Sequence, residues 1–148
     1  MKTTLFTMIA AIALFLSVRA AKDLKTTDNS VKVAFADLPK KLEYDFNKPS
    51  VRDAYYKKLD ALAATVITDD YAVSLKGHAD GIGAYKYNWV LSDKRAVSVK
   101  DYLVSKGVAI DRIITTPFGS TVPIASNETA AGRQKNRRVE IELKKIGK

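Results

Sequence analysis

The chain has 148 residues, which allows one compact domain with a short extension but hardly two domains. Its hydrophobic fraction of 47% and charged fraction of 28% exclude a largely disordered chain, and its net charge of +9 favours a negatively charged partner. Cysteine is absent and His78 is the single histidine, which excludes disulfides, cysteine nucleophiles and multi-histidine metal sites.

Residues 1–20 have the pattern of a secretory signal peptide. Lys2 is followed by an apolar run from Leu5 to Val18, and small residues stand at Val18 and Ala20. The apolar run is shorter than the roughly 20 residues that a membrane-spanning helix needs, so an uncleaved anchor is the second interpretation, and membrane association is expected only in that case. Because an exported protein rarely meets nucleic acid, we expect no nucleic-acid partner but a carboxylate-bearing or polyanionic polymer of the cell envelope.

Residues 21–40 are polar, and we interpret them as a flexible leader before a folded domain at residues 41–146. Residues 42–46 alternate apolar and acidic side chains, which predicts a strand with one buried face. Ser50 and Asp53 resemble a capping box, and a helix is predicted to end near Asp69. Its apolar stripe consists of Val51, Tyr55, Leu59, Leu62 and Val66.

Further elements alternate along the rest of the chain. The patterns predict a strand at 71–77, a glycine-rich loop at 78–83, a helix at 87–106 that Gly107 ends, a strand at 110–118, a short helix at 127–134 and a strand at 138–143. Pro117 indicates that the third strand ends at an edge or a turn. The order β-α-β-α-β-(α)-β predicts an α/β fold, an α+β sandwich in which helices pack on one mixed β-sheet.

Polar side chains that can bind a ligand follow the second strand. Asp80 lies between a strand and a helix, where ligands often bind at the end of a sheet. Asn88 and Arg95 are two helical turns apart and share a face that can point at Asp80. On spacing alone, a structural ion pair of Asp80 with Arg95 is the commoner interpretation. The alternative is a clamp for a zwitterion, with the carboxylate on an ammonium and the guanidinium on a carboxylate.

Three stretches of the chain resemble the OmpA-like domain. The loop and helix around Asn88 match its signature with the pattern Asp80-x-x-Gly83-x-x-x-Tyr87-Asn88-x-x-Leu91-Ser92-x-x-Arg95-Ala96-x-x-Val99. The C-terminal block matches with Asn127-x-Thr129-x-x-Gly132-Arg133-x-x-Asn136-Arg137-Arg138-Val139-Glu140-Ile141. Tyr44-Asp45-Phe46-Asn47 looks like the first strand of that domain, so the resemblance spans about residues 42–143.

The resemblance implies non-covalent binding of peptidoglycan through the free meso-diaminopimelate centre of its stem peptide, which tethers or organises the cell envelope. It implies that Asp80 and Arg95 hold this centre, with Asn88, Asp45, Arg137 and Arg138 as supporting residues. It also implies a periplasmic or outer-membrane-associated location, no catalysis and no cofactor. A second envelope protein remains a possible additional partner.

Several other patterns have simpler explanations. His78 and Asp80 supply only half of a usual metal shell, and Gly81-Ile-Gly83 lacks the glycine that completes a dinucleotide fingerprint. A solvated basic face is the commoner explanation for the cluster of Arg133, Lys135, Arg137, Arg138, Lys144 and Lys145.

The aromatic residues of the predicted helix at 87–106 are interpreted from their spacing. Tyr87 and Tyr102 stand at helical spacing and are interpreted as packing residues, whereas Trp89 is left as a residue that either packs or stacks on a sugar.

A cell-wall-acting enzyme is the rival hypothesis to a binding module, but it needs paired carboxylates or an activated nucleophile. The sequence offers only Asp80 and the more distant Asp45 near the predicted site.

Overall fold

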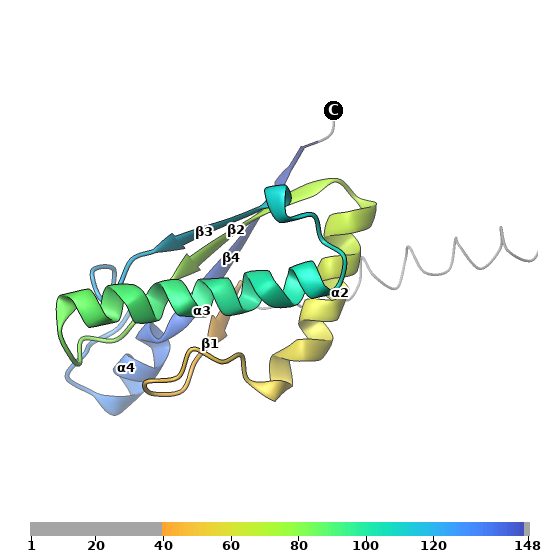
Figure 1. The fold of residues 1–148 in the computed structure, drawn as a ribbon. Helices are drawn as coiled ribbons and strands as arrows, with labels where there is room; N and C mark the ends of the chain where they lie inside the picture. The colour runs from red at the N-terminus through yellow and green to blue at the C-terminus, as the bar shows by residue number, and fades with distance from the viewer. Residues whose placement is uncertain (1–39, 147–148) are drawn as a thin grey trace, which may run out of the picture.

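A four-stranded mixed sheet with the strand order β1-β4-β2-β3 organises residues 40–146, which the computed structural model describes (Figure 1). Its strands are β1 (Lys41–Glu43), β2 (Tyr71–Gly77), β3 (Ile113–Pro117) and β4 (Arg138–Lys145). The helices are α2 (Tyr56–Thr68), α3 (Tyr85–Ser105) and α4 (Ala130–Asn136), with 3-10 turns η1 (Asp53–Tyr55) and η2 (Ile110–Arg112). The predicted signal segment 1–20 and all but the last residue of the predicted leader 21–40 lie outside the described residues.

β2 is one of the two inner strands of the sheet, and it pairs in parallel with β3 and antiparallel with β4. The shorter β1 pairs antiparallel with the other side of β4. This arrangement confirms the predicted mixed sheet with helices packed on it. Among the described residues, no helix combines the length and the apolar character that crossing a membrane requires.

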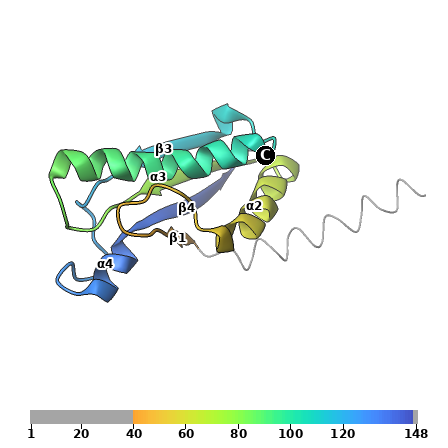
Figure 2. The same cartoon turned by 60° about the horizontal axis from the view of Figure 1, so that its bottom comes forward.

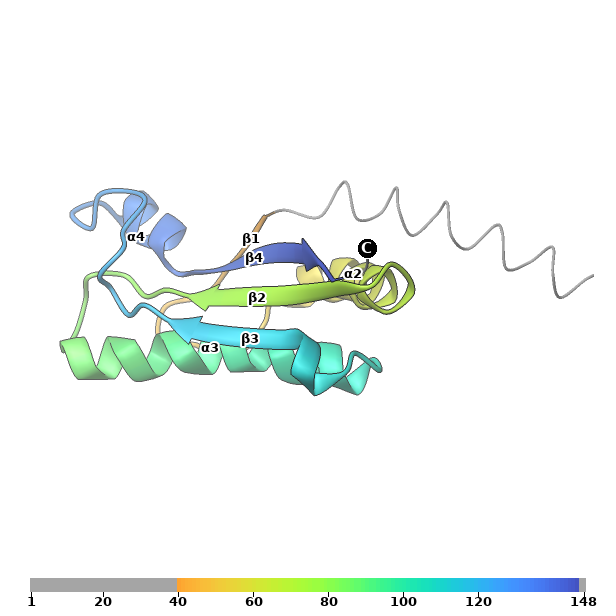
Figure 3. The same cartoon turned by 90° about the horizontal axis from the view of Figure 1, so that it is seen from above.

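The alternation of side chains along β2 determines which face of the sheet is buried. Val73 and Leu75 belong to the hydrophobic core, whereas Lys76 lies on the other face and pairs with Glu142 of β4 at 2.7 Å. Helices α2 and α3 cover the core face, and α3 runs along the strands (Figures 2 and 3). The predicted stripe of the first helix is confirmed at Leu59, Leu62 and Val66, which are fully buried, whereas Val51 and Tyr55 precede α2.

The end of β2 lies unusually close to α3. A Cβ atom on Gly77 would come within 1.9 Å of the carbonyl oxygen of Ser92, so only glycine fits there. The Ser92 hydroxyl in turn accepts a 2.9 Å hydrogen bond from the backbone N–H of Gly119. These contacts fix the first half of α3 above the loops that follow β2 and β3.

Three element boundaries differ from the predictions. The first strand ends at Glu43 rather than Phe46, because the chain turns at Asp45, where Lys48 N donates to Asp45 O and Asn47 has a positive φ of 56°. The Ser50 capping box does not form, since Arg52 is the N-cap residue of the following turn and no side chain caps it. The third strand begins only at Ile113, after the turn η2.

The other boundaries lie within a few residues of the predictions. Gly107 ends α3 with a φ of 98°, and Pro117 is the last residue of β3, an edge strand, as its sequence indicated. Thr129 caps α4, which begins three residues later than predicted, because its side chain accepts a hydrogen bond from Gly132 N. The resulting fold places three loops and the start of α3 at one end of the sheet.

Candidate functional site

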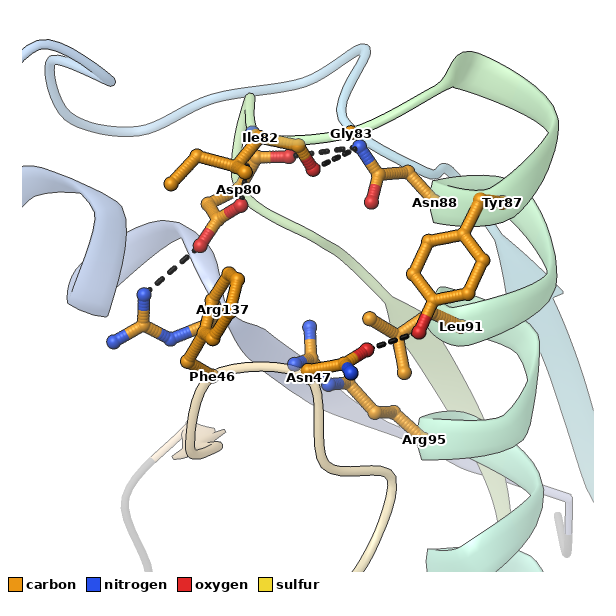
Figure 4. A pocket seen from close by; sticks show the side chains of 10 residues that line it. All are labelled: Phe46, Asn47, Asp80, Ile82, Gly83, Tyr87, Asn88, Leu91, Arg95 and Arg137. Atoms are coloured by element: carbon orange, nitrogen blue, oxygen red, sulfur yellow. Dashed lines mark hydrogen bonds and ion pairs between the residues drawn. The ribbon is translucent and has the colours of Figure 1, made fainter.

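A pocket of about 160 Å³ lies beyond the carboxyl end of β2 (Figure 4). The loop after β1, the loop after β2, helix α3 and the residue after α4 contribute its walls. Its lining residues are Phe46, Asn47, Asp80, Ile82, Gly83, Tyr87, Asn88, Leu91, Arg95 and Arg137. The pocket therefore brings together four of the six residues predicted for the site: Asp80, Asn88, Arg95 and Arg137.

Asp80 is held in a fixed orientation although it is almost completely buried, with 3% of its surface exposed. Its Oδ1 accepts a 3.0 Å hydrogen bond from the backbone N–H of Ile82. Its Oδ2 forms a 2.9 Å ion pair with Nη1 of Arg137. Since each carboxylate oxygen has two lone pairs, both oxygens keep one for a further donor.

Arg95 is fully buried, and its guanidinium contacts main-chain carbonyls rather than an acid. Nη1 donates to His78 O at 2.9 Å, Nε to Lys48 O at 3.0 Å and Nη2 to Asp45 O at 3.1 Å. A guanidinium has five N–H groups, so two remain for a ligand. Burial lowers the pKa of Arg95 to about 10, which still leaves it charged at neutral pH. A structural ion pair of Asp80 with Arg95, the commoner interpretation of the sequence spacing, does not form, and Asp80 pairs with Arg137 instead.

Asn88 positions the loop that carries Asp80. Its side-chain amide donates to the carbonyl oxygens of Asp80 at 3.2 Å and Ile82 at 3.0 Å. Gly83 in the same loop has a φ of 98°, a conformation that side-chain-bearing residues rarely adopt. The loop is therefore shaped by its own backbone and by α3, and Asp80 does not depend on a ligand for its position.

Arg137 connects the pocket to β1 and α4. Besides its ion pair with Asp80, its Nε donates to Tyr44 O at 3.1 Å and its Nη2 to Gln134 Oε1 at 2.5 Å. The guanidinium also lies 6.0 Å from the ring centroid of Phe46. The pocket lining consequently carries one carboxylate and two guanidiniums, an excess of one positive charge.

Asp45 and Arg138 lie outside the pocket lining. The Asp45 carboxylate is half exposed and pairs with Arg52 at 2.8 Å, so only its carbonyl oxygen, through Arg95, contacts the site. The Arg138 side chain is buried on another face, where it pairs with Glu140 at 2.7 Å and donates to Val122 O. Both residues support the surroundings of the pocket without entering it.

Sequence reasoning missed the apolar rim of the pocket. Phe46, Ile82 and Tyr87 are each about half exposed and line the opening. The interpretation of Tyr87 as a packing residue is wrong, because the residue is 51% exposed and its hydroxyl donates to Asn47 Oδ1. The same interpretation of Tyr102 is confirmed, since its ring packs against the core. Helical spacing alone did not show which residues of α3 face a loop and which face solvent.

Side chains of the C-terminal motif hold the loop beside the pocket in place through hydrogen bonds. Asn136 is fully buried, and its side chain bonds the backbone of Ile124 and Ala125 and the side chain of Asn127. Asn127 Oδ1 also accepts a 2.8 Å hydrogen bond from Gly81 N, next to Asp80. These residues tie α4 to the loop of Asp80.

No group of three or more histidine, cysteine or acidic residues that could hold a metal ion occurs among residues 40–146. His78 is buried and stacks on Phe118 with ring centroids 5.1 Å apart. Burial and the nearby Arg138 lower the pKa of His78 to about 4, so it is neutral at pH 7. The His78 side chain is therefore part of the packing.

The fold and the pocket define a small α/β domain that can bind a polar ligand with both acidic and basic groups. The OmpA family model matches residues 43–137, and this chain belongs to the OmpA family. That stretch contains every residue that lines the pocket.

Similar proteins agree with this assignment. The chain is 46% identical over 101 residues to outer membrane protein A of Bordetella avium and 53% identical over 72 residues to the peptidoglycan-binding protein ArfA of Mycobacterium tuberculosis. These matches cover 68% and 49% of this chain but only 52% and 22% of the relatives, so the chain corresponds to about half of their length or less. The crystal structure of the peptidoglycan-associated lipoprotein from Burkholderia pseudomallei has a TM-score of 0.70 at 26% identity, covering 72% of this chain and 91% of that one.

Proposed function

We propose that this chain binds peptidoglycan without cleaving it, and that its ligand is the free meso-diaminopimelate centre of the stem peptide. This function places it in the periplasm or at the cell envelope, where it tethers or organises the wall. The observation that carries the proposal is that Asp80 and Arg95 line one pocket with hydrogen-bonding capacity left on both.

The ligand matches these two side chains in charge. An uncrosslinked diaminopimelate ends in one carbon that bears an ammonium and a carboxylate. In the proposed complex the ammonium donates to Asp80, and the carboxylate accepts from the two remaining N–H groups of Arg95. Figure 4 shows the two residues on different sides of the open centre of the pocket, which is where the proposal places the zwitterion.

The supporting residues act on these two groups. Asn88 and Arg137 orient Asp80, the first through the loop backbone and the second through the ion pair. Asp45 supports Arg95 through its main-chain carbonyl. Arg138 supports the neighbouring loop through Val122 O. Two relatives whose names state peptidoglycan binding or association support the same ligand class for this chain.

The pocket chemistry favours binding over hydrolysis. A glycoside hydrolase commonly uses two carboxyl groups on either side of the scissile bond. Among the described residues that line the pocket, Asp80 is the single carboxylate, and it is already paired with Arg137. We therefore expect no muropeptides to be released when the protein is incubated with purified peptidoglycan.

Co-sedimentation with isolated sacculi tests the proposal. We expect Asp80→Asn and Arg95→Ala to lose at least about 30-fold in affinity, because truncating one partner of a buried charge interaction costs on the order of 2 to 5 kcal/mol. The matched control is Asp45→Asn, which removes a neighbouring carboxylate that does not line the pocket and should bind like the parent.

A comparison of two wall types tests the ligand itself. Stem peptides with lysine in place of diaminopimelate lack the carboxylate on that centre, so lysine-type sacculi should sediment little of the protein. Equal sedimentation with both wall types, or undiminished binding by both pocket variants, would contradict the proposed site.

A further inference from the structure

A second, shallower pocket of about 220 Å³ adjoins the first, and it has a different charge. The two pockets share Phe46, Ile82 and Arg137, and the second adds Ala130 and Arg133 of α4. No acidic residue lines it. The two pockets therefore adjoin at Phe46, Ile82 and Arg137, and we call the pair the groove.

Arg133 has hydrogen-bonding capacity left in this groove. Its Nη1 donates to the carbonyl oxygens of Asn127 at 2.9 Å and Glu128 at 3.0 Å, which uses one of its three nitrogens. Within residues 40–146, no carboxylate lies within ion-pair distance of Arg133. Its Nε and Nη2 can each donate to an anion.

The charge of the whole groove is not balanced by the proposed zwitterion. The two linings together contain the carboxylate of Asp80 and the guanidiniums of Arg95, Arg133 and Arg137, which is an excess of two positive charges. A diaminopimelate centre carries one positive and one negative charge, so its binding leaves this excess unchanged. Buried and half-buried cations of this kind favour a ligand with an additional anion.

We infer that Arg133 and the second pocket bind another carboxylate of the same stem peptide, the free α-carboxylate of the γ-linked glutamate that precedes diaminopimelate. This inference rests on the proposed function. The glutamate is joined to diaminopimelate by one amide bond. Its free α-carboxylate is therefore expected outside the first pocket, farther along the peptide chain than the bound diaminopimelate centre. Phe46 and Ile82, which both pockets share, pack against the connecting part of the ligand.

Titration of the full chain with three synthetic peptides tests the inference. The parent is L-Ala-γ-D-Glu-meso-diaminopimelate, the second peptide has the glutamate α-carboxylate converted to an amide, and the third has the C-terminal carboxylate converted instead. Loss of a charge-assisted hydrogen bond in a partly exposed site should weaken binding of the glutamate amide roughly three- to tenfold. The C-terminal amide should bind like the parent.

Variants of Arg133 connect this loss to the residue. Arg133→Gln should bind the parent as weakly as the wild type binds the glutamate amide, and it should no longer distinguish the two peptides. Lys135→Gln removes an equal charge from an exposed position of the same helix and should retain the full discrimination. The amide series on the wild type remains valid even if a variant folds poorly.

The outcomes separate this inference from the proposed function. If the wild type binds the parent and the glutamate amide equally, if the C-terminal amide is the one that binds weakly, or if Arg133→Gln still discriminates, the second carboxylate site is overturned while diaminopimelate binding stands. If the parent peptide does not bind at all, the proposed function itself is overturned.

Discussion

The main-chain carbonyl of His78 accepts a 2.9 Å hydrogen bond from Nη1 of Arg95. This bond joins the loop of Asp80 to helix α3, while the other nitrogens of Arg95 reach the loop after β1 at Asp45 and Lys48. One guanidinium therefore joins three of the pocket walls, namely α3 and the loops after β1 and β2. The same side chain serves both the proposed ligand contact and the folding of the site.

Replacement of Arg95 by lysine should lower the stability of the fold. An ammonium keeps the charge, but it cannot span three carbonyl groups in the plane that a guanidinium does. We expect the free energy of unfolding to fall by about 2 to 4 kcal/mol, as measured by urea denaturation. Arg112→Lys is the matched control, because Arg112 contacts Val66 O and Asp70 at the surface and should lose less than about 1 kcal/mol. Equal stability of Arg95→Lys and the wild type would contradict this account.

His78 should make the stability of the protein depend on pH in mildly acidic solution. Burial lowers the pKa of His78 to about 4 from the usual 6.5 of a histidine, with a further lowering by Arg138 and Lys76 and an opposing effect of Glu140. The unfolded chain therefore binds this proton more readily than the folded one. The stabilisation is complete above pH 6.5 and is lost as the pH falls through about 4, a change on the order of 3 kcal/mol.

Urea denaturation at pH 7, 5.5 and 4.5 checks this dependence. His78→Leu removes the titrating ring while keeping an apolar side chain against Phe118, so its free energy of unfolding should vary less over this range. Because Glu140 faces the same ring, Glu140→Gln serves as a second comparison. An identical pH dependence in His78→Leu and the wild type would show that another group is responsible.

Gly77→Ala should strongly destabilise the domain. The added methyl group would meet the Ser92 carbonyl oxygen at 1.9 Å, and both atoms belong to backbones that the sheet and α3 hold in place. A loss of about 3 kcal/mol is expected, which is the upper part of the usual range for overpacking. Gly107→Ala offers the contrast: its nearest contact would be 3.6 Å from Ile67, so its cost comes from the positive φ alone and should be about 1 kcal/mol. Thermal unfolding ranks the two variants, and the opposite order would contradict the steric explanation.

The regular elements could be predicted from the sequence because burial imposes their period. Val73 and Leu75 alternate with polar residues because one face of β2 is covered, and Leu59, Leu62 and Val66 recur at helical spacing because one side of α2 is covered. The end of β1 could not be predicted in this way. Besides the local hydrogen bond from Lys48 N, its turn is held by the contact of Arg95 with the carbonyl of Asp45, two residues that are far apart in the sequence.

The charged residues that line the pocket were predictable from the sequence, but their pairing and the apolar rim were not. The loop position of Asp80 and the helical spacing of Asn88 and Arg95 placed these three residues near one another, and they line one pocket. Periodicity contains no information that Arg137, at the end of α4, pairs with Asp80. Only the family resemblance pointed to Arg137, and nothing pointed to the rim formed by Phe46 and Ile82.

The sheet has two edge strands, and both are poor pairing partners for a strand of another molecule. β1 is 3 residues long, and β3 is 5 residues long and finishes at Pro117, which has no N–H group to donate. Short edges and proline are features with which natural proteins prevent sheets of neighbouring molecules from joining. The described part of this chain is thereby protected against edge-to-edge aggregation at high local concentration.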